Sequence, residues 1–576
     1  MTDSPIAQEL EPLFNPSSVA IIGATDNWNK WGFSTFSSVL NGFTGSVYPV
    51  NNRADTVLGH PAFKRITDIP APVDLAVFVI PAPAVPSAMA DCVARGVKAG
   101  LIISAGFAET GDEGKALQDE VLRIAKSGGI RFVGPNCMGF WSASSDLRAF
   151  MFPMLVKDGP LGFVSQGGNI GGAVVTAGYE RGVGFHRYVS CGCAADIQIE
   201  DYIEYFGEDP EIKVILAYIE GINNGKRFIE KVGRVTKKKP VIILKPGKTD
   251  AATSAIKSHS GALAGSNAIH DAVFRKAGVI RVETEEELLD VALGFLTQPL
   301  PAGRNVAIVT PGGSYGVLCA DACASQGLNV IKLPPETIAE LDRIFPPRWS
   351  HGNPIDPAGD RNFVAYLTAP QKILKLEDVD SLIFMGFGSF SGFTQTIASL
   401  DSGFSRSFGS VLASAKELEQ VFPLVAQVLS SGNTVEIGNV IRPAVARFGS
   451  LMNVDDEEEL EDFTQMLTSA LASGEIDFSY LAKSPRPDAP SATQDRELSQ
   501  WAGGLTDMID AILGGLVRYW VKSYGKPVIT TSFTEGASRL IGNHFSYSSG
   551  HRAARVLIKL VEYSEYLERE GINRTL

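Results

Sequence analysis

One stretch of the sequence decides how the rest is interpreted: Lys257-Ser258-His259-Ser260-Gly261-Ala262-Leu263-Ala264-Gly265-Ser266. It places one of only seven histidines between small residues, and it opens an amphipathic segment from Asn267 to Lys276. A short, glycine-flanked loop with one imidazole before a helix suits a residue that is transiently modified. From these residues alone, a capped helix start with an incidental histidine is the alternative.

The composition limits what kind of protein this chain is. At 576 residues it is long enough for several domains. It has 64 acidic and 51 basic residues and a net charge of −13, so we expect no nucleic-acid partner. Six cysteines make no disulfide framework, and the pairs at 191/193 and 319/323 lack the CxxC spacing of a zinc site, so we expect no metal. Without a long apolar run or a signal peptide, we expect a reduced, cytoplasmic protein and no membrane segment.

Short runs rich in valine and isoleucine alternate with helical patterns, which predicts an α/β fold with parallel sheets. The first unit should be Rossmann-like, with strands at 18–23, 46–50, 74–80 and 100–103 and a helix at 84–95. Its first strand ends in Gly23-Ala24-Thr25, a turn of the kind that places phosphates on backbone N–H groups. The complete GxGxxG pattern is missing, so a plain strand-to-helix turn remains the alternative.

Two more glycine-rich turns follow expected strands. Ser165-Gln166-Gly167-Gly168 comes after the strand at 161–164, and Thr310-Pro311-Gly312-Gly313-Ser314 comes after the strand at 305–309. Each turn leads into an expected helix, whose free N–H groups and dipole carry about half a positive charge at its start. Such a turn favours a bound anion, although close packing of helix on strand also requires glycine.

The stretch around His259 resembles the nucleoside-diphosphate-forming acyl-CoA synthetases, the superfamily that includes succinyl-CoA synthetase and the ADP-forming acetyl-CoA synthetases. The likeness continues through Ala277-Gly278-Val279-Ile280-Arg281-Val282 and Glu285-Glu286-Glu287-Leu288. Four more motifs are similar to the CoA-binding domain of that family, at residues 48–53, 80–82, 104–111 and 134–137. The resemblance covers about residues 1–390 and 521–576.

The resemblance implies a role for each matched residue. His259 would be a phosphohistidine that carries a phosphoryl group between an acyl phosphate and a nucleotide, and the Glu220 carboxylate would fix its tautomer. The residues expected to bind CoA are Gly23, Ala24, Thr25, Arg53, Ile80, Pro81, Ala105 and Asn136. Those expected to bind phosphate, at two helix starts that converge on His259, are Ser165, Gln166, Gly167, Gly168, Gly312, Gly313 and Ser314.

Three positions depart from the family's pattern. Arg53 stands where lysine is common, but either cation neutralises a phosphate. Gly167 replaces the second serine of Ser-Gln-Ser-Gly and so loses a hydroxyl. Cys193 stands where an asparagine is usual and loses an amide. The last two departures put the acyl-substrate preference, or full activity, in question.

We expect a CoA-binding Rossmann-like domain at 1–150, a flavodoxin-like domain with the histidine loop at 158–300, a further flavodoxin-like ligase domain at 301–391 and 521–576, and a mainly helical insertion at 392–520. The insertion is too short for an ATP-grasp module, so the chain resembles an alpha-type subunit. It would interconvert a small carboxylic acid, CoA and a nucleoside triphosphate with acyl-CoA, nucleoside diphosphate and phosphate. ATP (or GTP) with Mg²⁺ would be bound by an ATP-grasp beta-type subunit, in a hetero- or homo-oligomer.

The departures at Gly167 and Cys193 and the long insertion leave a second hypothesis open. The chain would then be a non-catalytic CoA- or acyl-CoA-binding regulatory protein or scaffold. The acidic run at 455–459 within the insertion is expected to be a solvated surface.

Overall fold

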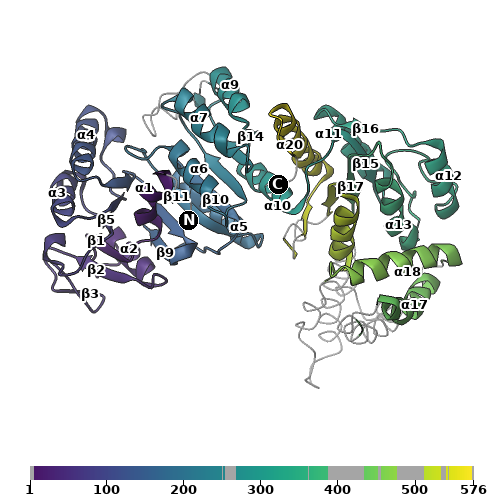
Figure 1. Cartoon of the computed structure of the whole chain (residues 1–576), viewed down its shortest axis with the longest axis horizontal. Helices are drawn as coiled ribbons and strands as arrows, with labels where there is room; N and C mark the ends of the chain where they lie inside the picture. Colours follow the sequence, from purple (N-terminus) through teal and green to yellow (C-terminus); the bar gives the residue numbers. More distant parts are fainter. Residues whose placement is uncertain are drawn as a thin grey trace. The chain divides into compact units, whose positions relative to one another are not determined.

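The computed structural model describes residues 5–249, 251–252, 267–360, 362–386, 428, 434–451, 454, 456–476, 512–532, 540–541 and 544–573. His259 and the rest of the loop at 253–266 lie outside the described residues. The chain divides into two compact units, one built mainly from Met1–Ala292 and the other mainly from Leu293–Glu568 (Figure 1). Within the described ranges, no helix combines the length and the apolar character that crossing a membrane requires.

The first sheet is the predicted Rossmann-like sheet. Its five parallel strands follow the order β2-β1-β5-β6-β7. They are β1 (Ser18–Ile22), β2 (Ser46–Val50), β5 (Leu75–Phe78), β6 (Ala99–Ile102) and β7 (Arg131–Val133). A small antiparallel pair, β3 (Thr56–Val57) and β4 (His60–Pro61), follows β2. Every residue of β1, β5 and β6 is buried, because helices cover both faces of a parallel sheet.

Helices pack on the two faces of this sheet in pairs. On one face lie α1 (Pro5–Phe14) and α2 (Trp31–Leu40), and on the other lie α3 (Val85–Arg95) and α4 (Asp112–Ser127) (Figure 1). The alternating side chains of β1 show the division, since Val19 and Ile21 belong to one core and Ala20 and Ile22 to the other.

The second sheet has seven strands in the order β14-β13-β12-β10-β11-β8-β9. Its parallel strands are β10 (Leu161–Ser165), β11 (Phe185–Ser190), β12 (Val214–Tyr218), β13 (Val241–Leu244) and β14 (Ile280–Val282). Its helices are α5 (Gly168–Glu180), α6 (Ile199–Glu208), α7 (Gly225–Val235), α9 (Asn267–Ala277) and α10 (Glu285–Thr297).

Two antiparallel strands complete this sheet: β8 (Gly139–Ser142) and β9 (Leu147–Phe150). Both end at or before residue 150, where the sequence places the end of the first domain, yet β8 pairs with β11 of the second sheet. The chain therefore enters the second sheet within the range 1–150 that the sequence assigns to the first domain.

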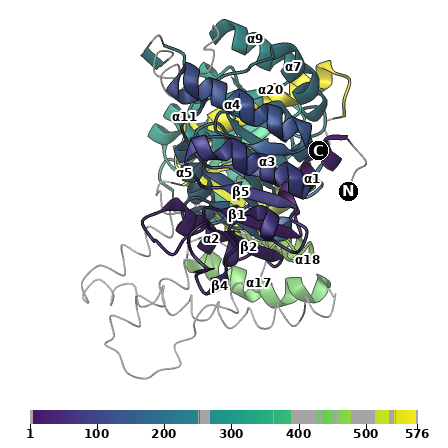
Figure 2. The ribbon, with the colours of Figure 1, turned by 90° about the vertical axis from the view of Figure 1, so that its left-hand side faces the viewer.

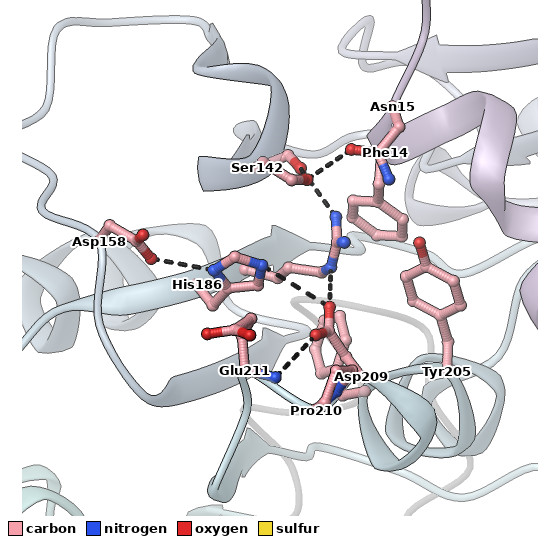
Figure 3. Close-up of polar contacts among 12 residues, drawn as sticks. Phe14, Asn15, Ser142, Asp158, His186, Tyr205, Asp209, Pro210 and Glu211 are labelled. Carbon is pink, nitrogen blue, oxygen red and sulfur yellow. Dashed lines mark hydrogen bonds and ion pairs between the residues drawn. The ribbon is translucent and has the colours of Figure 1, made fainter. Parts of the chain in front are cut away.

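A buried guanidinium ties α1 to the second sheet. The rings of Phe14 and Tyr205 are stacked with their centroids 5.0 Å apart (Figure 3). The buried Arg187 side chain of β11 lies beside this pair, with its Cζ 5.1 and 5.3 Å from the two centroids. Its Nε donates to Asp209 and its Nη1 to Ser142, each at 2.8 Å. Burial opposes ionisation of Asp209, but Arg187 outweighs it and holds the pKa of this carboxyl below its usual value.

The second unit contains a six-stranded sheet in the order β16-β15-β17-β18-β20-β19. The strands are β15 (Asn305–Val309), β16 (Asn329–Val330), β17 (Ser381–Met385), β18 (Val528–Thr531), β19 (Leu540–Ile541) and β20 (His544–Tyr547). Its helices are α11 (Gly313–Ser325), α12 (Pro335–Ile344), α13 (Phe363–Leu374) and α20 (Gly550–Arg569). β17 and β18 are parallel neighbours, so a strand within residues 521–576 lies beside a strand within residues 301–391 in one sheet.

The described part of the intervening segment contains helices. Its two long helices, α17 (Thr434–Leu451) and α18 (Glu457–Ala472), lie side by side (Figures 1 and 2). Phe463 and Met466 of α18 share a core with Ile373 of α13 and Leu382 of β17. The insertion is therefore packed into the core of the third sheet.

Candidate functional site

A cavity of about 1710 Å³ opens in the first unit where strands of both of its sheets end. The walls come from the segments after β1, β2 and β5 of the first sheet and after β10 and β12 of the second. Ligands in parallel α/β sheets bind at the carboxyl ends of the strands, so this is the expected location. The predicted site residues that line the cavity are Gly23, Thr25, Arg53, Ile80, Pro81, Ala105, Asn136, Gln166, Gly167, Gly168 and Glu220.

Other predicted site residues lie elsewhere. Ala24 and Ser165 are fully buried and contribute to the walls only through their neighbours. Gly312, Gly313 and Ser314 belong to the second unit, and His259 is outside the described residues. The predicted convergence of the two helix starts on His259 therefore stays a prediction.

The turn after β1 lines the cavity and requires a glycine. Gly23 has φ +101°, and a Cβ at this position would lie 2.3 Å from the carbonyl oxygen of Val79. The Asn51 side chain joins this turn to the next loop, since its Nδ2 donates to the Ala24 carbonyl at 2.8 Å and its Oδ1 accepts from the Arg53 N–H at 2.9 Å. Asn51 thus holds both the turn at Gly23-Ala24 and the loop of Arg53, two segments expected to bind CoA. Nothing in the sequence around Asn51 indicates this role.

Four cations line this end of the cavity: Lys30, Arg53, Lys64 and Arg65. Lys64 pairs with Asp55 at 2.7 Å and Arg65 pairs with Asp91, whereas Lys30 and Arg53 have no carboxylate within salt-bridge distance among the described residues. These two cations are available for an anionic ligand. Lys30 was not predicted, although its place directly before α2 is a usable signal, because a cation beside a helix start reinforces an anion site.

The start of α5 forms the opposite wall. Gly167 caps the helix in an extended conformation, and the Ser165 hydroxyl donates to the Gly167 carbonyl at 2.6 Å. Ser165 therefore closes the turn with its side chain. The first N–H groups of α5 lie beside the cavity, where they have no carbonyl of a preceding turn to bind. A phosphate group at this position would also gain from the helix dipole.

Gln166 links this helix start to Glu220. Its Oε1 accepts from the N–H groups of Glu220 and Gly221, and its Nε2 donates to the Gly221 carbonyl at 3.3 Å. The Gln166 N–H donates to the Tyr218 carbonyl at 3.1 Å. The amide was predicted to bind phosphate, but these contacts give it a second role, which is to hold the backbone after β12 in place.

Glu220 lies on the cavity wall with only 4% of its surface exposed. Lys245, at the end of the neighbouring strand β13, is also buried, and its Nζ donates to the Pro246 carbonyl at 2.6 Å. Burial and the nearby Arg281 lower the pKa of Lys245, while the Glu220 charge opposes this. A carboxylate and a cation thus flank the segment that leads into the loop of His259.

The Cys193 thiol forms another part of the wall, where the likeness predicts an asparagine. Its Sγ lies 3.6 Å from Glu109 Oε2, and the Cys193 N–H donates to the Pro135 carbonyl at 3.0 Å. Burial and the Glu109 charge raise the pKa of Cys193 to about 12, so the thiol is neutral at pH 7. Because the single thiol proton is directed to Glu109, the position offers the cavity an uncharged sulfur in place of an amide.

The second glycine-rich helix start repeats the first in its local geometry. Thr310 Oγ1 donates to the Gly312 carbonyl at 2.9 Å, as Ser165 does at Gly167. A carboxylate lies close by, because Asp356 Oδ2 is 2.9 Å from the position of a Cβ on Gly313. Asn353 fixes this segment by accepting from the Ile308 N–H at 2.9 Å. The segment at 353–356 has no role that can be derived from its sequence, and the structure shows that it places Asp356 at the start of α11.

Three families match successive parts of the chain: a CoA binding domain at residues 17–142, a succinyl-CoA ligase like flavodoxin domain at 158–295 and a ligase-CoA domain at 306–435. The sequence is 40% identical over 388 residues to acetate–CoA ligase [ADP-forming] II subunit alpha of Pyrococcus furiosus, covering 67% of this chain and 84% of that protein. It is 38% identical over 352 residues to acetate–CoA ligase [ADP-forming] of Methanocaldococcus jannaschii, covering 61% of this chain but only 49% of that relative. The chain thus spans about half the length of this second relative.

A solved structure with a similar fold is that of the Ca. Korarchaeum cryptofilum dinucleotide forming acetyl-coenzyme A synthetase 1 in complex with phosphate and ADP. The TM-score is 0.69 and the identity 25%, over 98% of this chain and 99% of that one. The alignment with the Pyrococcus relative has 40% identity and covers 84% of that protein. The chain therefore belongs to the ADP-forming acyl-CoA ligases, a family of acid–thiol ligases, and is of the alpha type.

Proposed function

We propose that this chain carries out the CoA-dependent part of a reversible reaction in which a carboxylate, CoA and a nucleoside triphosphate give acyl-CoA, nucleoside diphosphate and phosphate. One observation carries the proposal. A single cavity joins the Gly23 turn and Arg53 to the start of α5 and to Glu220. CoA is a long ligand with a nucleotide at one end and a thiol at the other, so it suits a cavity with phosphate-binding groups at one end and reactive groups at the other.

The residues at the nucleotide end fit CoA in size and charge. Gly23 keeps the turn tight, since its φ of +101° suits glycine and the Val79 carbonyl oxygen lies where a Cβ would be, and in this family of folds such a turn places backbone N–H groups at a pyrophosphate. Arg53 and Lys30 supply positive charge that no carboxylate of the described residues neutralises. In a chain with a net charge of −13, these local cations are needed to attract a polyanion.

The chemistry proceeds in two displacements when acyl-CoA is consumed. A phosphate oxygen attacks the thioester carbonyl, the C–S bond breaks, and CoA leaves as a thiol to give an acyl phosphate. A ring nitrogen of His259 then attacks phosphorus, the P–O bond to the acyl group breaks, and the carboxylate leaves. The N–H groups at the start of α5 would stabilise the phosphoryl charge, and Glu220 would hold the imidazole tautomer.

The phosphoryl group would then pass to a nucleoside diphosphate on another subunit. We place ATP (or GTP) and Mg²⁺ on an ATP-grasp beta-type subunit, because the Pyrococcus relative is itself a subunit alpha. The acid would be a small carboxylic acid, with acetate as the first to test because several relatives carry acetate in their names. All six cysteines are free thiols, which agrees with a reduced, cytoplasmic location.

Labelling the chain from [³²P]acetyl phosphate tests this proposal without the partner. The wild-type chain should take up label that is lost in acid and kept in base, and His259→Ala should take up none. Label that remains after His259→Ala, or none in the wild type, overturns the mechanism. Calorimetric titration with CoA completes the test, since CoA binding without labelling would instead support the non-catalytic scaffold hypothesis.

A further inference from the structure

An aromatic ring stands uncovered at the nucleotide end of the cavity. Of the described residues that line the cavity, two are aromatic: Trp31 and Tyr218. Tyr218 ends β12 in the second sheet, whereas Trp31 begins α2, beside the turn at Gly23. The Trp31 indole is 54% exposed, although a ring of this size gains much when a ligand or another side chain covers it.

The start of α2 determines where this ring lies. A Cβ on Gly32 would meet the Gly23 carbonyl oxygen, so the first turn of the helix packs directly on the Gly23 turn. Side chains of a helix lean toward its N-terminus, so the side chain of the first residue extends past the helix start. The Trp31 indole is therefore directed to the cavity and away from the outer face of α2.

Hydrogen bonds hold the loop that leads to Trp31. Thr25 Oγ1 accepts from the Asn27 N–H at 3.2 Å, and Asn27 Oδ1 accepts from the Asn29 N–H at 3.0 Å. The Asn27 carbonyl accepts from the Lys30 N–H at 3.0 Å. Side chains that bind the backbone two residues on fix a turn locally. The loop is thus ordered before a ligand arrives, which lowers the entropy cost of binding against the ring.

A cation and an aromatic ring stand next to each other in this segment, because Lys30 directly precedes Trp31 and both line the cavity. Cations attract the phosphates of CoA, but they attract other polyanions as well. A purine base stacks on the face of an indole, and this contact requires only the π-face of the base. The segment therefore offers a charge for a phosphate and a surface for a base.

We propose that Trp31 stacks on the adenine of CoA and makes the cavity select CoA over ligands that lack the base. The inference rests on the proposed binding of CoA in this cavity and adds the recognition of its base. Phosphate binding by Lys30 and Arg53 and base stacking by Trp31 are then separate contributions to affinity, and each can be removed without the other.

Three ligands separate the two contributions: CoA, adenosine 3′,5′-bisphosphate, which lacks the pantetheine arm, and 4′-phosphopantetheine, which lacks the base. Each is titrated into the full-length wild type and into Trp31→Ala by calorimetry. We expect Trp31→Ala to bind both adenine ligands about tenfold more weakly, the loss typical of one stacked base, and to bind 4′-phosphopantetheine with unchanged affinity. Trp31→Phe keeps a smaller ring and should lose only about threefold.

Tryptophan fluorescence gives a second readout that a purely structural role would not produce. Adenosine 3′,5′-bisphosphate should quench the fluorescence of the wild type, and this quenching should be absent in Trp31→Phe. Trp28→Ala is the matched control, because Trp28 belongs to the same loop and is 74% exposed but does not line the cavity. It should bind all three ligands as the wild type does.

The possible failures are distinguishable. If Trp31→Ala binds CoA as tightly as the wild type, the inference is wrong and the proposed function is unaffected. The same holds if Trp31→Ala loses as much affinity for 4′-phosphopantetheine as for CoA, or if Trp28→Ala loses as much as Trp31→Ala, because the base would then not be what Trp31 recognises. If the wild type does not bind CoA, the proposed function fails, and the inference fails with it.

Discussion

The carbonyl oxygen of Gly23 lies 2.0 Å from the position that a Cβ on Gly32 would occupy. The first turn of the CoA-binding sheet is therefore closed by the start of α2, and the two glycines form a matched pair. The spacing of these two glycines in the sequence does not fit the GxGxxG pattern, so by itself it is a weak sign of nucleotide binding.

Gly32→Ala should disturb this turn, because the new methyl group must push the Gly23 carbonyl away. We expect a loss of about 1–3 kcal/mol in unfolding free energy and weaker CoA binding, measured by thermal melting and calorimetry. Gly233→Ala in α7 is the matched control, since its Cβ would meet no atom nearer than 3.9 Å. It should stabilise its helix by up to about 1 kcal/mol and leave CoA binding unchanged. If both variants bound CoA with equal affinity, the contact between Gly32 and the Gly23 carbonyl would not be needed for CoA binding.

Arg53→Ala should weaken CoA binding, and more so at low salt. The lost cation faces a phosphate, so we expect about a tenfold rise in the dissociation constant and a smaller dependence of binding on ionic strength. Lys98→Ala serves as the control, because this lysine is paired with Asp74 at 2.7 Å and does not line the cavity. If Lys98→Ala weakened CoA binding as much as Arg53→Ala, the net charge of the protein, and not the position of Arg53 in the cavity, would determine the affinity for CoA.

Cys193 should be the first thiol to react with iodoacetamide. The other five cysteines are buried, and Cys193 alone among the six is partly exposed. Because burial and Glu109 raise its pKa to about 12, the rate should be low at pH 7 and rise about tenfold with each pH unit up to pH 10. CoA should protect it. Mass spectrometry of the labelled peptide measures the rate of modification. Fast modification at pH 7 that CoA does not slow would contradict the placement of Cys193 in the cavity wall beside Glu109.

Arg187→Met should destabilise the first unit, because the Asp209 carboxylate, whose side chain is only 11% exposed, would lose its cation. We expect a loss of about 3 kcal/mol, measured by chemical denaturation, and faster hydrogen exchange in α1. Lys115→Met removes a cation whose pair with Asp119 is exposed on both sides, and it should change stability by less than about 1 kcal/mol. A similar small effect in Arg187→Met would show that the two ring contacts and the ion pair contribute little.

Glu459 should make the packing of α18 depend on pH. Burial raises its pKa from 4.5 to about 7, although the Asn362 amide donates to both of its oxygens. The folded state therefore keeps a proton that the unfolded chain loses, so stability is full below pH 4.5 and falls as the pH rises to 7, by about 2–3 kcal/mol.

Hydrogen exchange in residues 457–472 at several pH values measures this effect. Glu459→Gln, which cannot ionise, should remove the pH dependence and protect the helix at pH 8. Glu461→Gln is the control on the same helix, because its partner Arg442 is exposed and the pair adds little. Exchange rates in the wild type that do not change between pH 5 and pH 8 would contradict the prediction.

The strands and the glycine-rich helix starts were predictable because their signals are local. A buried run such as 305–309 followed by Thr310-Pro311-Gly312 predicts both the strand and the turn after it, and β15 has those bounds. The family likeness added the roles of Glu220 and Arg53, and the structure brings both residues to one cavity.

The contacts that aim these residues were not predictable, since they join segments far apart in the chain. Gln166 meets Gly221 only because β10 and β12 are neighbours in the sheet, and Asn51 meets Ala24 only because β1 and β2 are. Nor does the pattern of β8 differ from that of a strand of the first sheet, so its antiparallel pairing with β11 was missed. Side-chain amides that form hydrogen bonds to the backbone of a distant segment produce no periodic pattern in a sequence.

The pairing of β17 with β18 sets a condition on the synthesis of this protein. Residues 386–527 separate the two strands, so β17 leaves the ribosome long before β18 is synthesised. Until then, the backbone N–H and C=O groups on the β18 side of β17 have no strand to pair with. An unpaired strand edge of five buried residues is a template for aggregation. Chains that are interrupted before residue 528 should therefore depend on chaperones far more than the finished protein does.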